Sequence, residues 1–295
     1  MESGDLKIFQ AVAQEGSITK AAARLGYVQS NVTARIQQLE TELNAPLFYR
    51  SNKGVILTSA GQNLLKYADQ ILHLLEEARL STQDDGEEVG GQLRIGSLET
   101  TAAVHLPGIM LDYHKRYPGV KLSLVTGHTS ELIQDILDYK LDGAFVSGQW
   151  DHPDLETLCA FKEELVLISE PTDADLQEVL RKPLLFFGKG CFHRDRLEQW
   201  LREENVGPLN IMVFGTLEAI MGGVSAGLGV SLLTRSAVRS WEQAGKVQSY
   251  RIPERYRNSI VSFVFRRDLL RTSAFHRFLC HVQRIAETVA GGESA

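Results

Sequence analysis

The chain has 295 residues, of which 43% are hydrophobic, and its formal net charge at pH 7 is −6. This length exceeds one small module and suits a small domain followed by a larger one. No apolar run is long enough to span a bilayer, and no charged-then-apolar leader precedes the first helix, so we expect a cytoplasmic protein with no membrane partner. Three scattered cysteines, Cys159, Cys191 and Cys280, indicate neither a disulfide framework nor a clustered zinc site.

Two short helices joined by a glycine are predicted within residues 16–40. Ser17 is placed to cap the first helix, predicted over residues 18–25, and Gly26 supplies the permissive backbone that a sharp turn between helices needs. The second helix has apolar residues at helical spacing, so one of its faces is expected to be buried. The expected buried stripe consists of Val28, Val32, Ile36, Leu39 and Leu43.

The outward face of the second helix is uncharged and able to form hydrogen bonds. Gln29, Ser30, Asn31 and Thr33 lie at its N-terminal end, which is the end that enters the major groove in helix-turn-helix proteins. Amides there can pair with adenine, and hydroxyls can pair with most base edges. An ordinary solvated helix face in a small bundle would carry similar residues, so this helix by itself does not decide the function.

A two-stranded hairpin is predicted next, over residues 47–57, with Ser51, Asn52, Lys53 and Gly54 at its tip. Cations at or near such a tip suit contacts to DNA phosphates. Helix, turn, helix and hairpin in this order predict a winged helix-turn-helix over residues 1–58, because a consistent set of elements is stronger evidence than an isolated one. The expected DNA-binding residues are Ser17, Thr19, Gln29, Ser30, Asn31, Thr33, Arg35, Arg50 and Lys53.

The same residues carry a family resemblance. Phe9 and the phrases GSITKAAARLGYVQSNVT, QQLE, LFYR and LTSAG resemble the DNA-binding domain of LysR-type transcriptional regulators, and the rest of the chain is similar in length, element order and a late GLGVSLL. The resemblance implies a sequence-specific bacterial regulator that binds double-stranded promoter DNA and contacts RNA polymerase. Val28 stands where the family often has Ser or Thr, which leaves the usual side-chain cap in question. Asn44 replaces the usual glycine but tolerates a left-handed backbone.

Charge is distributed unevenly along the chain. Residues 1–58 contain six Lys and Arg against five Asp and Glu, a net charge of +1, whereas residues 59–295 contain 25 against 32, a net charge of −7. Phosphate neutralisation supplies most non-specific affinity for DNA, so a nearly neutral reading domain predicts modest binding per protomer. Tight binding to a site would then require two or more copies acting together.

A long amphipathic helix is predicted after the hairpin, with Ser59 and Gln62 as a capping-box pair and the acidic linker TQDDGEEVGG at its end. It could simply pack on its own domain. The family resemblance instead implies antiparallel pairing through residues 59–80, giving a homodimer, or a homotetramer of two such dimers. We assign residues 59–90 to this linker helix and a hinge. Its apolar positions are Leu64, Leu65, Ala68, Ile71, Leu72 and Leu75.

From Gln92 onward, short apolar strands alternate with helices, which predicts a parallel α/β sheet in two similar halves. The chain is expected to recross near residues 261–265 and to end on a helix back in the first half. This pattern resembles the two-lobed, periplasmic-binding-protein-like effector domain of the family. We assign it to residues 91–295, with lobe I at about 91–162 and 266–295 and lobe II at about 163–265.

Ligands of such sheets bind beyond the carboxyl ends of the strands, where loops and helix N-termini gather. Three loops that precede helices are candidates here, at residues 97–101, 127–130 and 188–191, and Lys189, His128, His193 or Arg194 could add a positive charge. Hydroxyls and backbone amides at helix starts bind anions, so we expect an anionic small-molecule effector between the lobes and no cofactor. Each hydroxyl by itself could also do no more than cap a helix. The expected effector-binding residues are Ser97, Leu98, Glu99, Thr100, Thr101, His128, Thr129, Ser130, Lys189 and Cys191.

Three rival functions remain to be weighed. Residues 223–227 match G-x-S-x-G, but a helix is predicted before the serine and a strand after it, the reverse of a hydrolase elbow, so no enzyme is expected. Cys191 has no second cysteine nearby in sequence to resolve an oxidised form, which disfavours thiol sensing. A plain solute-binding protein would explain the two lobes but not the first ninety residues.

Overall fold

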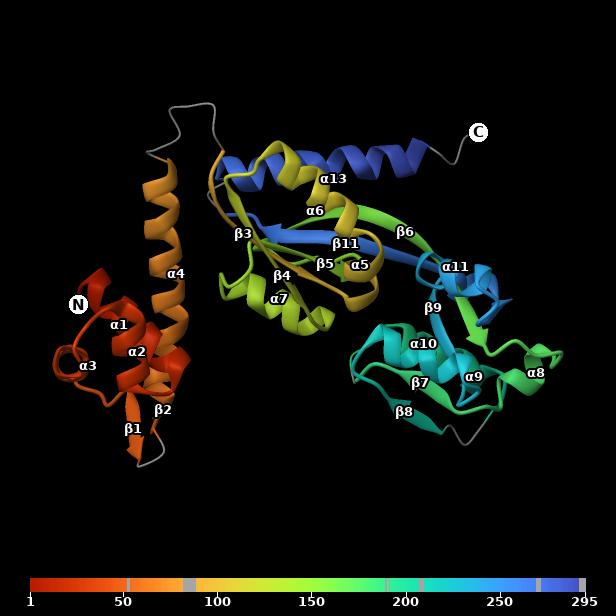
Figure 1. The fold of residues 1–295 in the computed structure, drawn as a ribbon, viewed down its shortest axis with the longest axis horizontal. Coiled ribbons are helices and arrows are strands. Elements are labelled where there is room, and N and C mark those ends of the chain that lie inside the picture. Colours follow the sequence, from red (N-terminus) through yellow and green to blue (C-terminus); the bar gives the residue numbers. More distant parts are fainter. Residues whose placement is uncertain are drawn as a thin grey trace. The chain divides into compact units, whose positions relative to one another are not determined.

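The computed structural model describes residues 1–51, 54–81, 89–188, 190, 192–206, 210–268 and 272–291. Contacts divide the chain into two compact units, Met1–Gly86 and a larger unit of Glu87–Leu137 with Leu141–Ala295. We call them the N-terminal and C-terminal units and describe each by itself (Figure 1). Within the described ranges, no helix combines the length and the apolar character needed to cross a bilayer.

The N-terminal unit consists of three helices, a two-stranded hairpin and a long helix. Its core is built from the inner faces of the helices, where Phe9, Val12 and Val32 are fully buried. The ring of Phe9 lies 5.3 Å from that of Phe48 and thereby joins the first helix to the hairpin. The elements are α1 (Ser3–Glu15), α2 (Ile18–Leu25), α3 (Gln29–Glu42), β1 (Phe48–Ser51), β2 (Gly54–Leu57) and α4 (Ser59–Ser81).

The structure confirms the turn between α2 and α3 and shortens the predicted stripe. Gly26 has a left-handed φ of 71°, and Ser17 caps α2 by accepting from the amide of Lys20. Val32, Ile36 and Leu39 of the stripe are buried. Val28 is 68% exposed and Leu43 is 38% exposed, so the prediction was wrong for both ends. Val28 is the N-cap residue of α3, before its first turn, and Leu43 is the C-cap residue after its last.

Two further helix ends depend on specific residues. Asn44 has a φ of 48°, so it takes the left-handed conformation expected in place of glycine. The cap of α4 is Thr58 instead of the predicted Ser59: its Oγ1 accepts from the amide of Gly61 at 3.0 Å and donates to the carbonyl of Pro46 at 2.7 Å. The second bond ties the start of α4 to the segment before the hairpin, and Ser59 has no such partner among the residues that the structure describes.

The C-terminal unit is built on a seven-stranded mixed sheet. Its strand order is β10-β6-β11-β5-β3-β4, with β9 paired to β6. The predicted parallel arrangement holds for β3 with β4 and β5, whereas β11 pairs antiparallel with both β5 and β6. The strands of the whole C-terminal unit, inside and outside this sheet, are β3 (Gly91–Ser97), β4 (Val120–Thr126), β5 (Gly143–Ser147), β6 (Leu155–Ser169), β7 (Leu184–Phe186), β8 (Ile211–Val213), β9 (Ser231–Thr234), β10 (Gln248–Arg251) and β11 (Asn258–Arg266).

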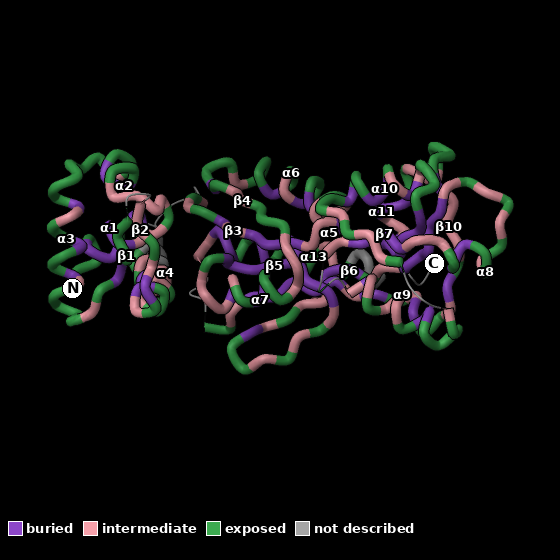
Figure 2. Tube along the Cα trace, turned by 90° about the horizontal axis from the view of Figure 1, so that it is seen from below, coloured by how far each residue is buried: buried purple, intermediate pink, exposed green. Residues whose placement is uncertain are grey.

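Helices cover both faces of the first half of this unit. In Figure 1, α6 and α13 lie on one face of the strands and α7 on the other. In Figure 2, buried residues follow the strands and exposed residues the outer faces of the helices. The helices are α5 (Glu99–Val104), α6 (Leu106–Arg116), α7 (Thr129–Leu137), α8 (Leu176–Val179), α9 (Phe192–Glu203), α10 (Leu217–Ser225), α11 (Arg235–Gln243), α12 (Glu254–Arg257) and α13 (Ser273–Gly291).

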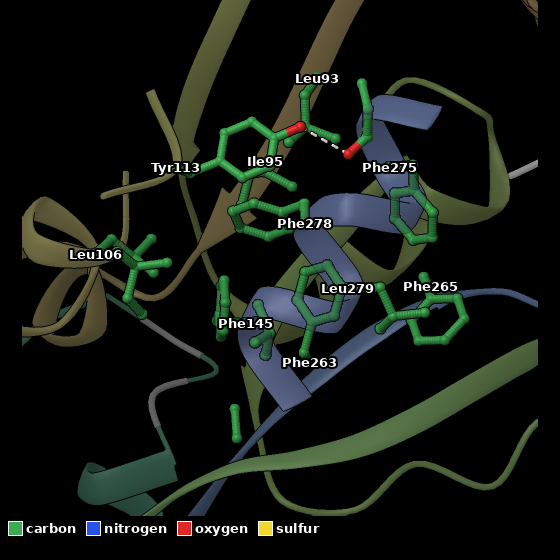
Figure 3. Close-up of a cluster of buried hydrophobic side chains, with 14 of the residues drawn as sticks. Leu93, Ile95, Leu106, Tyr113, Phe145, Phe263, Phe265, Phe275, Phe278 and Leu279 are labelled. Atoms are coloured by element: carbon green, nitrogen blue, oxygen red, sulfur yellow. Dashed lines mark hydrogen bonds between the residues drawn. The ribbon is translucent and has the colours of Figure 1, made fainter. Parts of the chain in front are cut away.

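An aromatic cluster forms the core between the sheet and α13. Phe263 on β11 and Phe278 on α13 are fully buried, with ring centroids 5.7 Å apart. Tyr113 on α6 is also fully buried, and its hydroxyl donates to the carbonyl of Ala274 at 2.7 Å (Figure 3). Burial raises the pKa of Tyr113 above its ordinary value. The last helix of the chain thus completes the first half.

The long strand β6 belongs to both halves. Residues 155–164 of β6 pair with β11 in the first half, and residues 165–169 pair with β9 and β10 in the second. The second half has two apolar cores, one containing Trp200 of α9 and the other Val224 of α10. β11 falls inside the range 163–265 that the sequence assigned to lobe II, but its buried side chains pack in the first-half core.

Candidate DNA-binding surface and effector cavity

The N-terminal end of α3 is exposed, as a surface that reads DNA must be. Gln29, Ser30 and Asn31 are all exposed. The side-chain oxygen of Gln29 accepts a hydrogen bond from the hydroxyl of Thr19 on α2 at 3.2 Å. The hydroxyl of Thr33 donates to the backbone carbonyl of Gln29 at 2.9 Å. Contacts from both helices therefore fix Gln29, and no side chain caps α3 at Val28.

Two of the arginines expected to contact DNA are held in ion pairs within the N-terminal unit. Arg35 on α3 pairs with the buried Asp5 of α1 at 2.8 Å. Arg50 on β1 pairs with Glu40 at 3.3 Å, and Glu40 also accepts from the amide of Leu47 at 2.8 Å. These pairs hold both guanidinium groups on defined parts of the surface, although their remaining N–H groups can still donate to phosphate.

The hairpin is fastened to the turn before α2. The amide of Val55 donates to the carbonyl of Gly16 at 2.9 Å. A side chain at Gly54 would meet that same carbonyl at 2.4 Å, and the φ of Gly54 is 129°, so this position requires glycine. Ser17, placed next to this contact, serves as the cap of α2. Lys53, expected at the tip of the hairpin, lies outside the described residues.

A cavity of about 320 Å³ opens in the C-terminal unit, lined by residues of both of its halves. Its walls come from segments that follow the carboxyl ends of β3, β4, β5, β7 and β8, which is where ligands bind in open α/β sheets. The expected residues that line it are Leu98, Glu99, Thr100, His128 and Thr129.

Three of the expected effector residues that the structure describes are not among the lining residues. Ser97 is fully buried and its hydroxyl donates to the carbonyl of Leu98, so it has no free group to offer. Thr101 is buried one position further along α5 than Thr100, and Ser130 is exposed at the outer side of the start of α7. Lys189 and Cys191 lie outside the described residues.

Two histidines and two carboxylates stand among the lining residues. Burial and the nearby Arg196 lower the pKa of His193 to about 4, so its imidazole is neutral at pH 7. The carboxylate of Glu131 accepts from the amide of His128 at 3.3 Å and thereby closes the start of α7. Thr129 accepts from the amide of Ser147 at 3.3 Å, and the buried hydroxyl of Ser147 has no hydrogen-bond partner.

The serine of the G-x-S-x-G match is placed as the sequence predicted. It ends the helix α10, and Gly227, with a φ of 78°, follows before the strand β9. A nucleophile elbow needs a strand before its serine and a helix after it, so this serine is not one. Across the described ranges, no group of three His, Cys, Asp or Glu side chains is arranged to hold a metal ion.

Two family models match the chain. Residues 3–62 match a bacterial regulatory helix-turn-helix protein of the lysR family, and residues 86–286 match a LysR substrate-binding domain. The chain belongs to the LysR family. It is therefore a DNA-binding transcriptional regulator with an effector-binding domain, and not an enzyme.

Individual LysR-family proteins match along nearly the whole chain. The HTH-type transcriptional regulator YofA of Bacillus velezensis is 55% identical over 279 residues, covering 95% of this chain and 96% of that protein. Full-length OxyR from Pseudomonas aeruginosa matches with a TM-score of 0.74 at 23% identity, covering 97% of this chain and 95% of OxyR. Full-length CbnR in complex with its target DNA matches with a TM-score of 0.70 at 24% identity, covering 97% and 100%.

Sequence reasoning missed part of the cavity wall of this LysR-family regulator. Gly127 and Gly190 lie in candidate loops, and His193 was a candidate for a positive charge there; all three line the cavity. The missed residues of the first half adjoin predicted ones, and the end of β5 could have been included by the same strand-end rule. The missed lining residues are Thr126, Glu131, Ser147, Phe187, Phe192 and Gly215.

Proposed function

We propose that this LysR-family regulator binds promoter DNA as a homodimer, or as a pair of such dimers, in the cytoplasm, and that an effector carrying an anionic group controls this binding and the contact with RNA polymerase. The observation that carries the proposal is the cavity at the strand ends of both halves of the C-terminal unit, in a chain whose N-terminal unit presents an exposed α3. The two features lie in separate compact units, and a ligand-controlled DNA-binding protein is the function that uses both.

The long helix α4 supplies the surface for dimerisation. One of its faces packs on its own unit, where Ala68 is fully buried and Leu64 and Leu72 pack against the core. Beside that face, α4 still exposes large apolar side chains, which a second copy of α4 would cover. They are Tyr67, Ile71, Leu74 and Leu75. Two nearly neutral reading domains joined in this way would bind a two-fold site with combined affinity.

Effector control depends on the two halves that share the cavity. They are joined through β6 and β11, and the carboxylate of Glu163 on β6 contacts His105 of the first half and accepts from Ser236 of the second at 2.9 Å. A ligand that binds one arrangement of the halves more tightly shifts the population toward it. Hydroxyls of the lining residues and the starts of α7 and α9 offer donors to an anionic group.

The experiment is an electrophoretic mobility shift of the full chain on the DNA upstream of its own gene, over a salt series. We expect a specific complex that persists at salt concentrations where binding to unrelated DNA is lost, because phosphate contacts are screened and base contacts are not. Equal loss of both complexes would contradict the proposal. Adding small carboxylates, one at a time, then tests effector control as a change in the affinity or mobility of the specific complex.

A further inference from the structure

The charges around the effector cavity are unbalanced. Among the described lining residues there are two carboxylates, Glu99 and Glu131, and no lysine or arginine. Burial keeps the imidazole of His193 uncharged at neutral pH, so this side chain does not compensate them. A ligand that carried only negative charge would therefore enter a cavity whose described wall already has negative charge.

The two carboxylates differ in what they contact. Glu131 is exposed, and its carboxylate accepts a hydrogen bond from the amide of His128 at the start of α7. Glu99 is half-buried at the first position of α5, and it makes no hydrogen bond or ion pair with any residue that the structure describes. A partly desolvated carboxylate is costly without a partner, which makes Glu99 the group most in need of a ligand cation.

Hydroxyls with unused hydrogen bonds stand in the same wall. Ser147 is 8% exposed, and its Oγ has no hydrogen-bond partner among the residues that the structure describes. Thr100, which is 6% exposed, lines the cavity as well. Thr129 uses its Oγ1 as an acceptor for the amide of Ser147, so its own O–H remains free to donate. Buried polar groups are almost always hydrogen-bonded, so the hydroxyl of Ser147 requires an acceptor that the described protein does not supply.

We infer that the effector is a small zwitterion with an amino group and a carboxylate, an amino acid in the simplest case, whose ammonium group binds Glu99 and whose carboxylate accepts from the hydroxyls of Thr100, Thr129 and Ser147. This inference rests on the proposed function and specifies the ligand of the same cavity. Such a molecule adds no net charge and provides both missing partners. The volume of about 320 Å³ lies at the small end of ligand sites, as a molecule of this size requires.

The test compares each proteinogenic amino acid except proline, in its L form where it is chiral, with the 2-hydroxy acid of the same skeleton. Each pair keeps the carboxylate and side chain and exchanges an ammonium group for a neutral hydroxyl. Binding to the full chain is measured by isothermal titration calorimetry, after a screen for shifts in melting temperature. We expect at least one amino acid to bind about tenfold or more tightly than its hydroxy acid, since hydrogen bonds to charged groups are the stronger class.

The variant Glu99→Gln isolates the ammonium contact. It should weaken binding of the amino acid by about tenfold and bring the two members of the pair to similar affinity, because the neutral amide gains little from a positive charge. The matched control is Glu254→Gln, which removes the same charge at the first position of α12, outside the cavity, and should leave both affinities unchanged. Glu254→Gln should also keep the specific complex with DNA.

The outcomes separate this inference from the proposed function. If a hydroxy acid or another simple carboxylate binds as tightly as its amino counterpart, or if Glu99→Gln keeps the difference between them, the zwitterion is overturned and effector control stands. If no amino acid binds while specific DNA binding is retained, the zwitterion is likewise overturned. Loss of specific DNA binding by the unmodified chain is a failure of the proposed function and is seen in the mobility shift without any ligand.

Discussion

The hydroxyl of Thr19 on α2 donates a hydrogen bond to the side-chain oxygen of Gln29 on α3, with 3.2 Å between the two oxygens. This contact joins the two helices of the helix-turn-helix across their exposed ends. It also fixes which side of the Gln29 amide carries the oxygen, and so where its NH2 group can donate to a base edge. Thr19 is therefore placed as a positioning residue for Gln29.

Replacing Thr19 with valine should relax base preference while leaving non-specific binding intact. The shape of the side chain is kept, but the bond that orients Gln29 is lost. A well-placed amide contributes about 1–3 kcal/mol of discrimination, so we expect preference at one base position to fall by roughly fivefold or more. Selection from a randomised half-site measures it. Thr41→Val, near the end of α3, is the control. Equal loss on all sequences would contradict the role of Thr19.

Gly61→Ala should destabilise the N-terminal unit alone. A Cβ at this position would meet the carbonyl of Leu47 at 2.2 Å, and overpacking of this kind costs about 1–3 kcal/mol. All three tryptophans, Trp150, Trp200 and Trp241, lie in the C-terminal unit. We therefore expect an earlier thermal transition in far-UV circular dichroism with an unchanged tryptophan transition.

The control for this variant is Gly4→Ala in α1, where a Cβ meets nothing within 4 Å. It should leave the N-terminal unit as stable as before or slightly more so, because alanine favours the helix. A wild-type melting curve for Gly61→Ala would show that the close approach to Leu47 is relieved without cost.

His193 should make the C-terminal unit less stable as the pH falls from 7 toward 4. Its pKa is about 4 in the folded chain against an ordinary 6.5, so in this range the unfolded chain binds the extra proton. The contribution of the neutral His193 imidazole to the free energy of unfolding is fully present above about pH 6.5 and amounts at most to about 3 kcal/mol. Urea unfolding followed by tryptophan fluorescence at pH 7.5 and 5.0 measures it.

The variant His193→Gln should remove part of that pH dependence, because glutamine does not titrate. His114→Gln, an exposed histidine of α6 in the same unit, should keep the wild-type slope. If His193→Gln and the wild type lose the same free energy of unfolding between the two pH values, the imidazole is not held neutral in the fold.

Charge placed on the outer face of α4 should separate the protomers. Leu74→Glu combined with Leu75→Glu puts two like charges on each copy in the proposed contact. We expect sedimentation velocity to show a monomer and the specific DNA complex to weaken by a factor of a hundred or more, because the gain from joining two binding modules is about 10²–10⁴. Gln62→Glu, exposed on the same helix, is the control. An unchanged dimer would place the contact elsewhere.

Local signals in the sequence were sufficient for the N-terminal unit. Gly26 and Ser17 act through neighbouring residues of the chain, so their roles could be predicted without the rest of the fold. The errors occurred where a distant contact decides between equal candidates. Thr58 and Ser59 are both suitable caps, and the carbonyl of Pro46 favours the first. Val28 fits the helical spacing, yet it precedes the first turn and remains exposed.

The effector cavity was predictable only in part, for a related reason. Each loop at a strand end could be identified from sequence, and Glu99 and Thr129 were. Whether Phe187, Phe192 and Gly215 line the cavity depends on the antiparallel pairing of β6 with β11, whose residues are about a hundred positions apart in the chain. No local pattern encodes that register, so these three residues of the second half could not be predicted.

Because β11 and α13 pack in the first-half core, the cores of the protein are completed in a definite order during its synthesis. Every residue of the second-half cores has been made once the ribosome has passed Tyr256. The first-half core starts some seventy residues before the second, yet it lacks Phe263, Phe275 and Phe278 until the last helix emerges. A nascent chain therefore holds a complete DNA-reading unit and a complete second half while its first half is still open, and loss of the final thirty residues would remove Phe275 and Phe278 from the core of that half.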